Sequence, residues 1–217
     1  MKKLRQGGYV IYLRHTQTDS KTEDKDLSDM SNCVNQRVLS AVGRKNATKL
    51  GEIFGSLVIP LGDVITNQFC RTKDTATLMK LEITKETADL NNDSCDPFVT
   101  KDESERRAMA LRQLLAPAPK AGKNTLIVGH VPNLRNAVSL DYANMKEGEV
   151  AVFRPKQDDP GFELVARIAQ DGLQSVAKNS SARQSKGASG PFLIPGLHEV
   201  GRSCPSPFVC YSFCFCR

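Results

Sequence analysis

Four residues of this chain have the types needed to bind and transfer a phosphoryl group: Arg14, His15, Arg71 and His130. The guanidinium of arginine is a planar fork of donors that matches the oxygens of phosphate. A neutral imidazole can attack phosphorus, and a second imidazole can hydrogen-bond an oxygen on which charge develops. The ordinary pKa of histidine is about 6.5, and neighbouring arginine charges disfavour its protonated form. A site that binds phosphate through these arginines therefore also keeps a nucleophilic histidine neutral.

Each of these residues follows a short apolar run of the kind found in buried β-strands. The three runs are residues 9–13, 64–66 and 125–128, followed by Arg14-His15, by Arg71 and by Gly129-His130. The carboxyl ends of parallel strands meet at one edge of an α/β sheet, where ligands bind. Taken alone, Arg14 and His15 can equally be residues that end a strand and face solvent. Because two of the three histidines follow such runs, we expect the four side chains to share one pocket.

Helical patterns alternate with these runs along the chain. Ser40 is a candidate N-cap for a helix whose apolar face recurs at helical spacing and which ends before Pro60. Further helices are predicted from Thr72 and over 102–115, two late strands over 150–153 and 162–168, and loops over 16–35 and 85–101. This alternation predicts an α/β fold: a three-layer sandwich with a mostly parallel central sheet and helices on both faces.

Four segments resemble the histidine phosphatase superfamily, also called phosphoglycerate-mutase-like. Leu13-Arg14-His15-Thr16 resembles its Arg-His-Gly signature, with Thr16 where glycine is usual. Residues 36–51 are similar to the first helix of the family, Cys70–Ala76 to its second arginine, and Val128–His130 to its second histidine. The matches follow the order of the family and extend from about Leu4 to Gly172.

The resemblance implies a metal-independent phosphoric monoester hydrolase that needs no cofactor and acts on a small phosphorylated substrate. His15 would form a phosphohistidine, and Arg14, Arg71 and His130 would complete the phosphate pocket. Thr18 matches a position where a hydroxyl often contacts phosphate, although it can equally be a solvated loop residue.

Within the family, the chain resembles small bacterial members that are often exported. In such relatives Cys33 and Cys70 could pair as a disulfide, whereas in a reducing cytoplasm they would be free thiols.

Three other functions stay open at this point: a phosphoglycerate-type mutase, a protein phosphohistidine phosphatase, and a non-catalytic module that binds phosphate. A mutase must hold a second anionic group, and no insert rich in Arg and Lys occurs between Thr72 and Asn124. A phosphatase also needs a general acid that protonates the leaving alkoxide. The carboxyl groups that can supply it, each of which can also be a solvated surface group, belong to Asp93, Asp96, Glu103, Glu147 and Glu149.

The net charge of +6 is weak support for nucleic-acid binding, because it is concentrated at one end of the chain. Residues from Val176 onward carry five Lys and Arg against one Glu, so the body keeps only +2. No apolar stretch approaches the roughly 18 to 20 residues that span a bilayer. We therefore expect neither nucleic acid nor a membrane as a partner, and the sequence indicates no oligomeric state.

The two ends of the chain differ from the body. An apolar segment typical of a signal peptide does not follow Met1-Lys2-Lys3, so the chain as written is expected to be cytoplasmic. It would be periplasmic or secreted if a leader had been lost. The phosphatase domain is predicted over 1–175, followed over 176–217 by a disordered Ser/Lys/Gly linker and a tail rich in Cys and aromatic residues. The four cysteines of that tail form no CxxC pair, which disfavours a zinc site.

Overall fold

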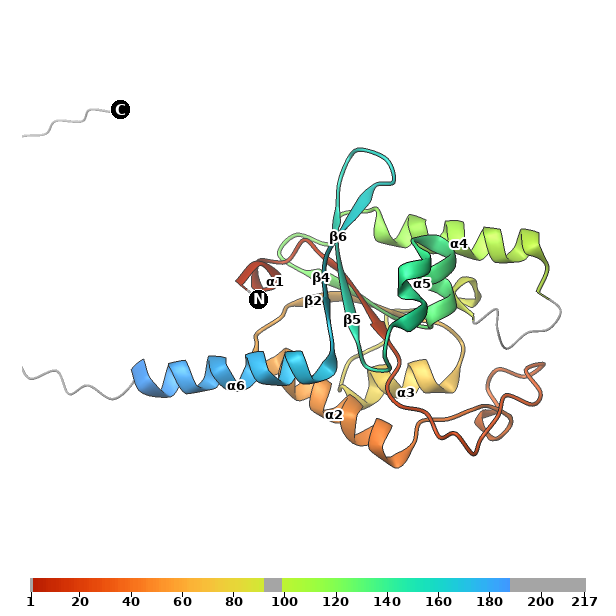
Figure 1. The fold of residues 1–217 in the computed structure, drawn as a ribbon, viewed down its shortest axis with the longest axis horizontal. Helices are drawn as coiled ribbons and strands as arrows, with labels where there is room; N and C mark the ends of the chain where they lie inside the picture. Colours follow the sequence, from red (N-terminus) through yellow and green to blue (C-terminus); the bar gives the residue numbers. More distant parts are fainter. Residues whose placement is uncertain (1, 92–98, 188–217) are drawn as a thin grey trace, which may run out of the picture.

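The computed structural model describes residues 2–91 and 99–187, and a six-stranded sheet forms its centre (Figure 1). The order of the strands is β3-β2-β4-β1-β5-β6. The first four are parallel, whereas β5 runs antiparallel to both β1 and β6. The strands are β1 (Val10–Arg14), β2 (Leu61–Thr66), β3 (Lys85–Glu86), β4 (Asn124–Gly129), β5 (Val150–Pro155) and β6 (Phe162–Ile168). The predicted mostly parallel sheet is confirmed.

Helices cover both faces of this sheet, as predicted. Figure 1 shows α2, α3 and α6 on one face and α4 and α5 on the other. The α-helices are α1 (Lys2–Gln6), α2 (Ala41–Ser56), α3 (Cys70–Leu78), α4 (Lys101–Leu115), α5 (Val131–Ala137) and α6 (Gln170–Gly187). The short 3-10 helices are η1 (Cys33–Asn35), η2 (Ala88–Leu90) and η4 (Leu140–Asn144). None of the helices in the described ranges is long and apolar enough to cross a membrane.

Strand β1 lies between two apolar cores because its side chains alternate between the faces of the sheet. Ile11 and Leu13 belong to the core beneath α2, α3 and α6. Val10 and Tyr12 belong to the core beneath α4 and α5. All four side chains are buried, which fixes the register of the strand and hence the position at which Arg14 and His15 leave it.

Three helices begin next to the strand ends, and a side-chain cap determines where α2 begins. The Ser40 hydroxyl accepts a hydrogen bond from the Gly43 amide at 3.0 Å, so α2 begins as predicted. Helix α3 begins at Cys70, two residues before the predicted start at Thr72, and Arg71 therefore lies in its first turn. Helix α5 follows His130 directly and was not among the predicted elements.

Helix α6 continues past the domain boundary predicted at residue 175. Within the stretch predicted as a linker from residue 176, the chain is helical as far as Gly187. Leu173 and Ala177, one turn apart, are both buried in the core beneath α2, and this packing outweighs the modest helix propensity of the serines. The remainder of the predicted linker and tail, residues 188–217, lies outside the described residues.

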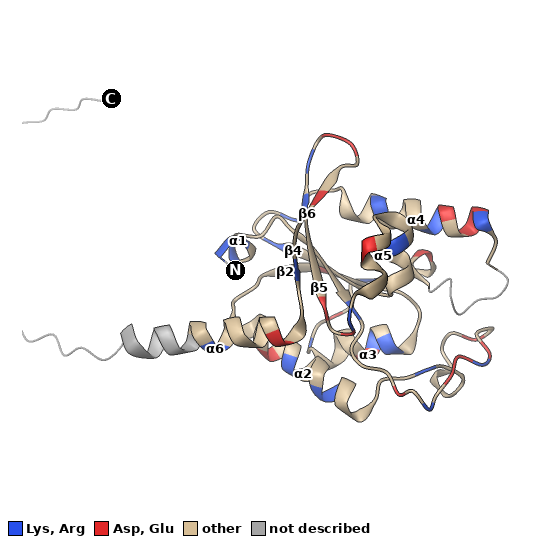
Figure 2. Cartoon of the chain, in the orientation of Figure 1, with Lys and Arg blue, Asp and Glu red and all other residues tan. Residues whose placement is uncertain are grey.

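Charges of both signs alternate along the described surface. Figure 2 shows Lys and Arg interspersed with Asp and Glu on α4 and along the loop that follows β1. Neither segment therefore carries a stripe of basic residues of the kind that binds nucleic acid.

Candidate active site

A small cavity of about 110 Å³ opens at the carboxyl ends of β1 and β4. Its lining includes all four residues predicted as catalytic. The residues that line it are Arg14, His15, Asp24, Arg37, Arg71, His130, Val131, Pro132 and Glu147. The adjacent ends of the two parallel strands bring the histidines together, with ring centroids 5.1 Å apart.

The ring of His15 is oriented by the backbone beside it. Nδ1 lies 2.9 Å from the carbonyl oxygen of Thr16. A carbonyl oxygen only accepts hydrogen bonds, so Nδ1 carries the proton and Nε2 keeps its lone pair. Burial, and next the nearby charge of Arg71, lower the pKa of His15 to about 3. The ring is therefore neutral at ordinary pH, and Nε2 is the nitrogen that keeps a lone pair.

Thr16 joins the end of β1 to α3. Its side chain is fully buried, and its amide donates to the Thr75 hydroxyl at 3.2 Å. That hydroxyl in turn donates to the carbonyl oxygen of Arg71 at 2.7 Å. The hydroxyls of Thr16 and Thr75 also lie 3.4 Å apart. The backbone amide of Thr16, together with its hydroxyl, thus connects the segment that carries His15 with the helix that carries Arg71.

His130 is held at the start of α5 by its own backbone. The hydroxyl of Tyr12 donates to its carbonyl oxygen at 2.9 Å, and its amide donates to Asn133 Oδ1 at 3.1 Å. The ring stands edge-on to that of Phe69, with centroids 5.1 Å apart. Burial, and next the charge of Arg71, hold the pKa of His130 well below its ordinary value.

The glycine before His130 is required by the same contact with Tyr12. A Cβ atom on Gly129 would lie 2.1 Å from the Tyr12 hydroxyl oxygen. No larger residue fits without displacing the tyrosine that holds the His130 backbone. The residue before His130 is therefore a glycine because only glycine leaves room for the Tyr12 hydroxyl.

Arg14 reaches the cavity from the last position of β1. One of its terminal nitrogens donates to the carbonyl oxygen of Met145, and the other lies 3.8 Å from Glu147 Oε1. Burial lowers the pKa of Arg14, and the negative charge of Glu147 partly opposes that effect. The Gly148 amide donates to the carbonyl oxygens of Arg14 and His15, both at 3.1 Å, which fastens the turn before β5 to the end of β1.

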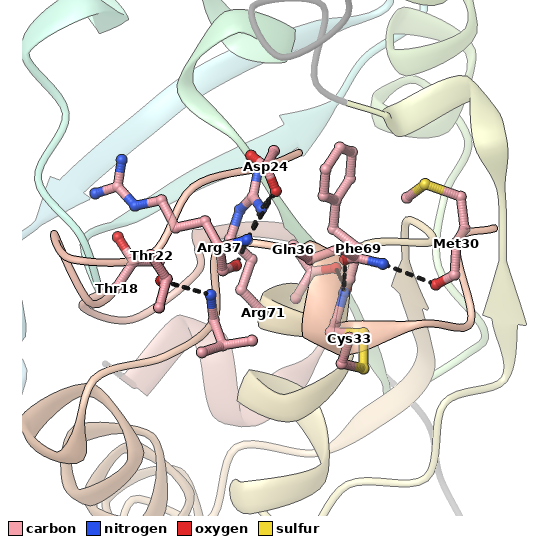
Figure 3. A network of polar contacts seen from close by, with 12 residues as sticks. Thr18, Thr22, Asp24, Met30, Cys33, Gln36, Arg37, Phe69 and Arg71 are labelled. Carbon is pink, nitrogen blue, oxygen red and sulfur yellow. Dashed lines mark hydrogen bonds and ion pairs between the residues drawn. A yellow bond between two sulfur atoms is a disulfide. The ribbon is translucent and has the colours of Figure 1, made fainter. Parts of the chain in front are cut away.

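The guanidinium of Arg71 is buried in a set of contacts that fix its direction. Nη1 donates to Asp24 Oδ1 at 2.9 Å and to the carbonyl oxygen of Arg37 at 3.2 Å (Figure 3). The group also lies over the Phe69 ring, 4.2 Å from its centroid. Asp24 Oδ1 accepts a second hydrogen bond, from the Arg37 amide at 2.9 Å.

Asp24 and Arg37 line the cavity but were not predicted as site residues. Both come from the long segment between β1 and α2, and Asp24 is 47 residues from its partner Arg71. The polar composition of this segment predicts a loop and does not indicate which of its acids turns inward. For Arg37 a signal existed, because it lies in one of the stretches that resemble the family.

Three nitrogens of cavity-lining residues have no hydrogen-bond partner within the described residues: Arg14 Nε, Arg37 Nε and His130 Nε2. All three are buried. Buried nitrogens of this kind are rarely left without an acceptor in a folded protein. Their gathering around one cavity suits a ligand with several acceptor oxygens, such as a phosphoryl group.

Thr18 contacts the site indirectly, through a residue that lines the cavity. It is buried and is not among the cavity-lining residues. Its hydroxyl donates to Glu147 Oε1 at 2.8 Å, and its amide lies 3.3 Å from the same oxygen. The predicted phosphate contact of Thr18 is therefore replaced, in this structure, by a contact with a carboxylate that lines the cavity.

The five carboxyl groups that the sequence offers as general acids differ in their surroundings. Glu149 is buried and bonded to Arg167 at 2.8 Å, and Glu103 pairs with Arg106 and Arg107 on α4. Asp93 and Asp96 lie outside the described residues. Of these five, Glu147 is the one that lines the described cavity. Asp24, which was not predicted as an acid, lines it as well.

A disulfide between Cys33 and Cys70 ties the loop after β1 to the first residue of α3. It is the pairing that the family resemblance suggested. Gln36 reinforces the connection, because its side chain accepts from the Cys70 amide at 2.8 Å and donates to the Met30 carbonyl oxygen at 2.9 Å (Figure 3). The loop that supplies Asp24 and Arg37 is thus attached beside Arg71.

No protein-family model matches the chain, and no curated protein sequence matches it. Solved structures do resemble it. Bacillus stearothermophilus YhfR is 17% identical with a TM-score of 0.52, over 73% of this chain and 95% of that one. The protein histidine phosphatase SixA, complexed with tungstate, is 15% identical with a TM-score of 0.51, over 76% and 99%. The mycobacterial glucosyl-3-phosphoglycerate phosphatase Rv2419c is 15% identical with a TM-score of 0.50, over 74% and 98%. At these identities the comparisons establish a shared fold.

Proposed function

We propose that this chain, which has the α/β fold of these histidine phosphatases, is a phosphomonoester hydrolase that acts through a phosphohistidine at His15. The observation that carries the proposal is the state of His15. Its ring is neutral, its Nδ1 is bonded to a backbone carbonyl, and its Nε2 is left for attack in a cavity lined by three arginines. The substrate class is a small phosphorylated molecule.

The first half of the reaction transfers the phosphoryl group to the protein. Arg14, Arg37 and Arg71 neutralise the dianionic phosphoryl group with charge-assisted hydrogen bonds. His15 Nε2 attacks phosphorus while the bond to the alcohol oxygen breaks, and His130 hydrogen-bonds an oxygen on which charge develops. The alcohol leaves, and the phosphoryl group remains on Nε2.

The second half of the reaction restores the histidine. Water attacks the phosphohistidine, the phosphorus–nitrogen bond breaks, and inorganic phosphate leaves. The same arginines hold the group throughout, so no rearrangement of the pocket is required between the two halves.

The test is turnover of an aryl phosphate together with trapping of the intermediate. Wild-type protein is expected to hydrolyse the ester, and His15→Ala is expected to lower kcat by about 10³-fold or more. Label from a phosphorylated substrate should appear on the wild-type protein in an acid-labile, base-stable form, and it should be absent from His15→Ala.

A matched control uses an arginine that does not line the cavity. Arg44 is half-exposed on α2 and pairs with Asp74 at 3.0 Å. Arg44→Ala is expected to leave turnover unchanged. If wild-type protein binds phosphate but turns over no ester, the chain is a phosphate-binding module and the enzymatic proposal fails.

We infer further that the protein works in an oxidising compartment, in the periplasm or outside the cell. The Cys33–Cys70 disulfide supports this inference, because such bonds persist in oxidising compartments and are rare in the reducing cytosol. Alkylation of protein taken from its native cells without reductant tests it. Labelling of both cysteines would favour the cytoplasm instead.

A further inference from the structure

An alkyl phosphate needs a proton on its leaving oxygen. In the proposed phosphatase mechanism, the arginines and histidines of the cavity do not supply that proton. A carboxylic acid in hydrogen-bond reach of that oxygen contributes typically about 10² to 10⁴ in rate. Within the described residues, two carboxyl groups line the cavity beside His15: those of Asp24 and Glu147. Their surroundings assign them different roles.

The carboxylate of Asp24 is held in place as the partner of Arg71. One of its oxygens accepts from both the Arg71 guanidinium and the Arg37 amide, each at 2.9 Å. The two side chains of this ion pair are only 8% and 3% exposed. Protonating Asp24 would remove the carboxylate charge that faces a buried arginine, which is strongly unfavourable. Asp24 therefore positions Arg71 and stays ionised.

The carboxylate of Glu147 is more exposed than that of Asp24, and its ion pair is longer. It lies on the turn before β5, its side chain is 22% exposed, and its ion pair with Arg14 spans 3.8 Å. Its closest partner is the Thr18 hydroxyl at 2.8 Å, a group that can rotate and accept a hydrogen bond as well as donate one. A proton on Glu147 leaves Arg14, whose side chain is 26% exposed, to solvent and to a bound phosphoryl group, and solvent can supply that proton.

Substrate binding itself favours this protonation. Arg14 is the arginine that Glu147 faces, and it is one of the groups that would hold the phosphoryl dianion. A dianion beside Arg14 offsets the positive charge that stabilises the Glu147 carboxylate and places like charge next to it.

We propose that Glu147 is the catalytic residue that protonates the leaving group, an inference that rests on the proposed phosphatase function. As His15 Nε2 bonds to phosphorus and the ester bond breaks, the Glu147 proton passes to the departing oxygen, giving a neutral alcohol and a carboxylate. In the second half the Glu147 carboxylate takes a proton from the attacking water. Phosphate leaves, His15 is again neutral, and Glu147 is again an acid.

The experiment compares leaving groups in Glu147→Gln, measured as kcat/KM, which covers the steps up to release of the alcohol. An aryl oxygen leaves readily without a proton, whereas an alkyl oxygen does not. Glu147→Gln is expected to lower kcat/KM for an alkyl phosphate by a factor about 10² larger than for an aryl phosphate. The Gln amide oxygen can still accept from Thr18, so the turn is preserved.

Asp24→Asn is the matched control, since it neutralises the other carboxyl group of the same cavity. It is expected to lower kcat/KM for both esters by the same factor, chiefly by raising KM, because Arg71 loses its orienting partner. Equal losses on both esters in Glu147→Gln would overturn the proposal, and so would a selective loss on the alkyl ester in Asp24→Asn.

Failure of the phosphatase function would be recognised separately, because wild-type protein would then turn over neither ester. Misfolding of a variant is also distinguished. The deciding quantity is a ratio between two esters measured on one protein sample, and a reduced fraction of folded protein lowers both rates equally.

Discussion

The ring of His15 has one nitrogen bonded to a backbone carbonyl and the other facing a cationic cavity. At this position the backbone selects the tautomer, and burial with Arg71 removes the charge. We predict that NMR signals of the His15 ring nitrogens show a neutral ring protonated at Nδ1 at pH 7. Their titration should occur well below the ordinary pKa of about 6.5. A His15 signal that titrates near 6.5 would contradict the nucleophile assignment.

The same depressed pKa affects stability in acid. The folded-state pKa of His15, about 3, lies below the unfolded value, so between the two the unfolded chain binds more protons. The free energy of unfolding therefore falls as the pH drops from about 6.5 towards 3, by up to about 1.4 kcal/mol per pH unit from this group. His15→Asn, whose amide can keep the bond to Thr16, is expected to show a shallower decline in urea unfolding between pH 7 and pH 4.

At the level of single residues, the sequence predicts the site where strand ends determine it. Arg14, His15 and His130 lie at or directly after the ends of adjacent parallel strands, and the topology alone brings them together. Asp24 and Arg37 belong to a loop whose course is determined by long-range contacts with Cys70 and Arg71. No local pattern encodes such contacts, so these two residues could not be predicted in the same way.

At the level of elements, the loop between β1 and α2 depends on one covalent link. The Cys33–Cys70 disulfide closes a segment of 37 residues, and disulfides of this kind typically contribute about 2–4 kcal/mol. We predict that reduction lowers the free energy of unfolding by that amount. It should also raise KM for an aryl phosphate several-fold, because Asp24 and Arg37 lose their attachment beside Arg71.

Denaturant unfolding and steady-state kinetics with and without reductant measure both effects. The double variant Cys33→Ala/Cys70→Ala provides the control, since the chain has five other cysteines on which a reductant can act. Its stability and KM should match those of the reduced wild type and should not respond to reductant. Reduced wild type with an unchanged KM would show that the loop holds its position without the bond.

The elements that the sequence predicts well are those with a strong local pattern. The apolar face of α2 and the buried runs of β1 and β4 leave few alternatives. Helix α5 has only 7 residues, and two-residue β3 pairs with β2 through its backbone, so neither offers a periodicity to detect. Helix α6 was missed because its serines, lysines and glycine resemble a linker when the packing partner is unknown.

At the level of the whole molecule, α6 closes the core that lies behind β1, the strand that carries Arg14. Leu173 belongs to the same apolar cluster as Leu13, the residue before Arg14, and α6 contacts α2. The fold class is predictable from the alternation of strands and helices, whereas the packing of α6 is not. That packing depends on which face of α2 remains uncovered once the sheet has formed, a property of the assembled molecule.

The contribution of α6 is open to a direct test with two leucines of opposite exposure. Leu173 is 2% exposed, whereas Leu164 on β6 is 47% exposed. Leu173→Ala is expected to cost about 2–5 kcal/mol of unfolding free energy, because it leaves a cavity between α6 and the core. Leu164→Ala removes the same atoms from a partly solvated site and should cost under about 1 kcal/mol. Chemical denaturation of both variants measures the difference, and equal, small losses would mean that α6 does not pack on the domain.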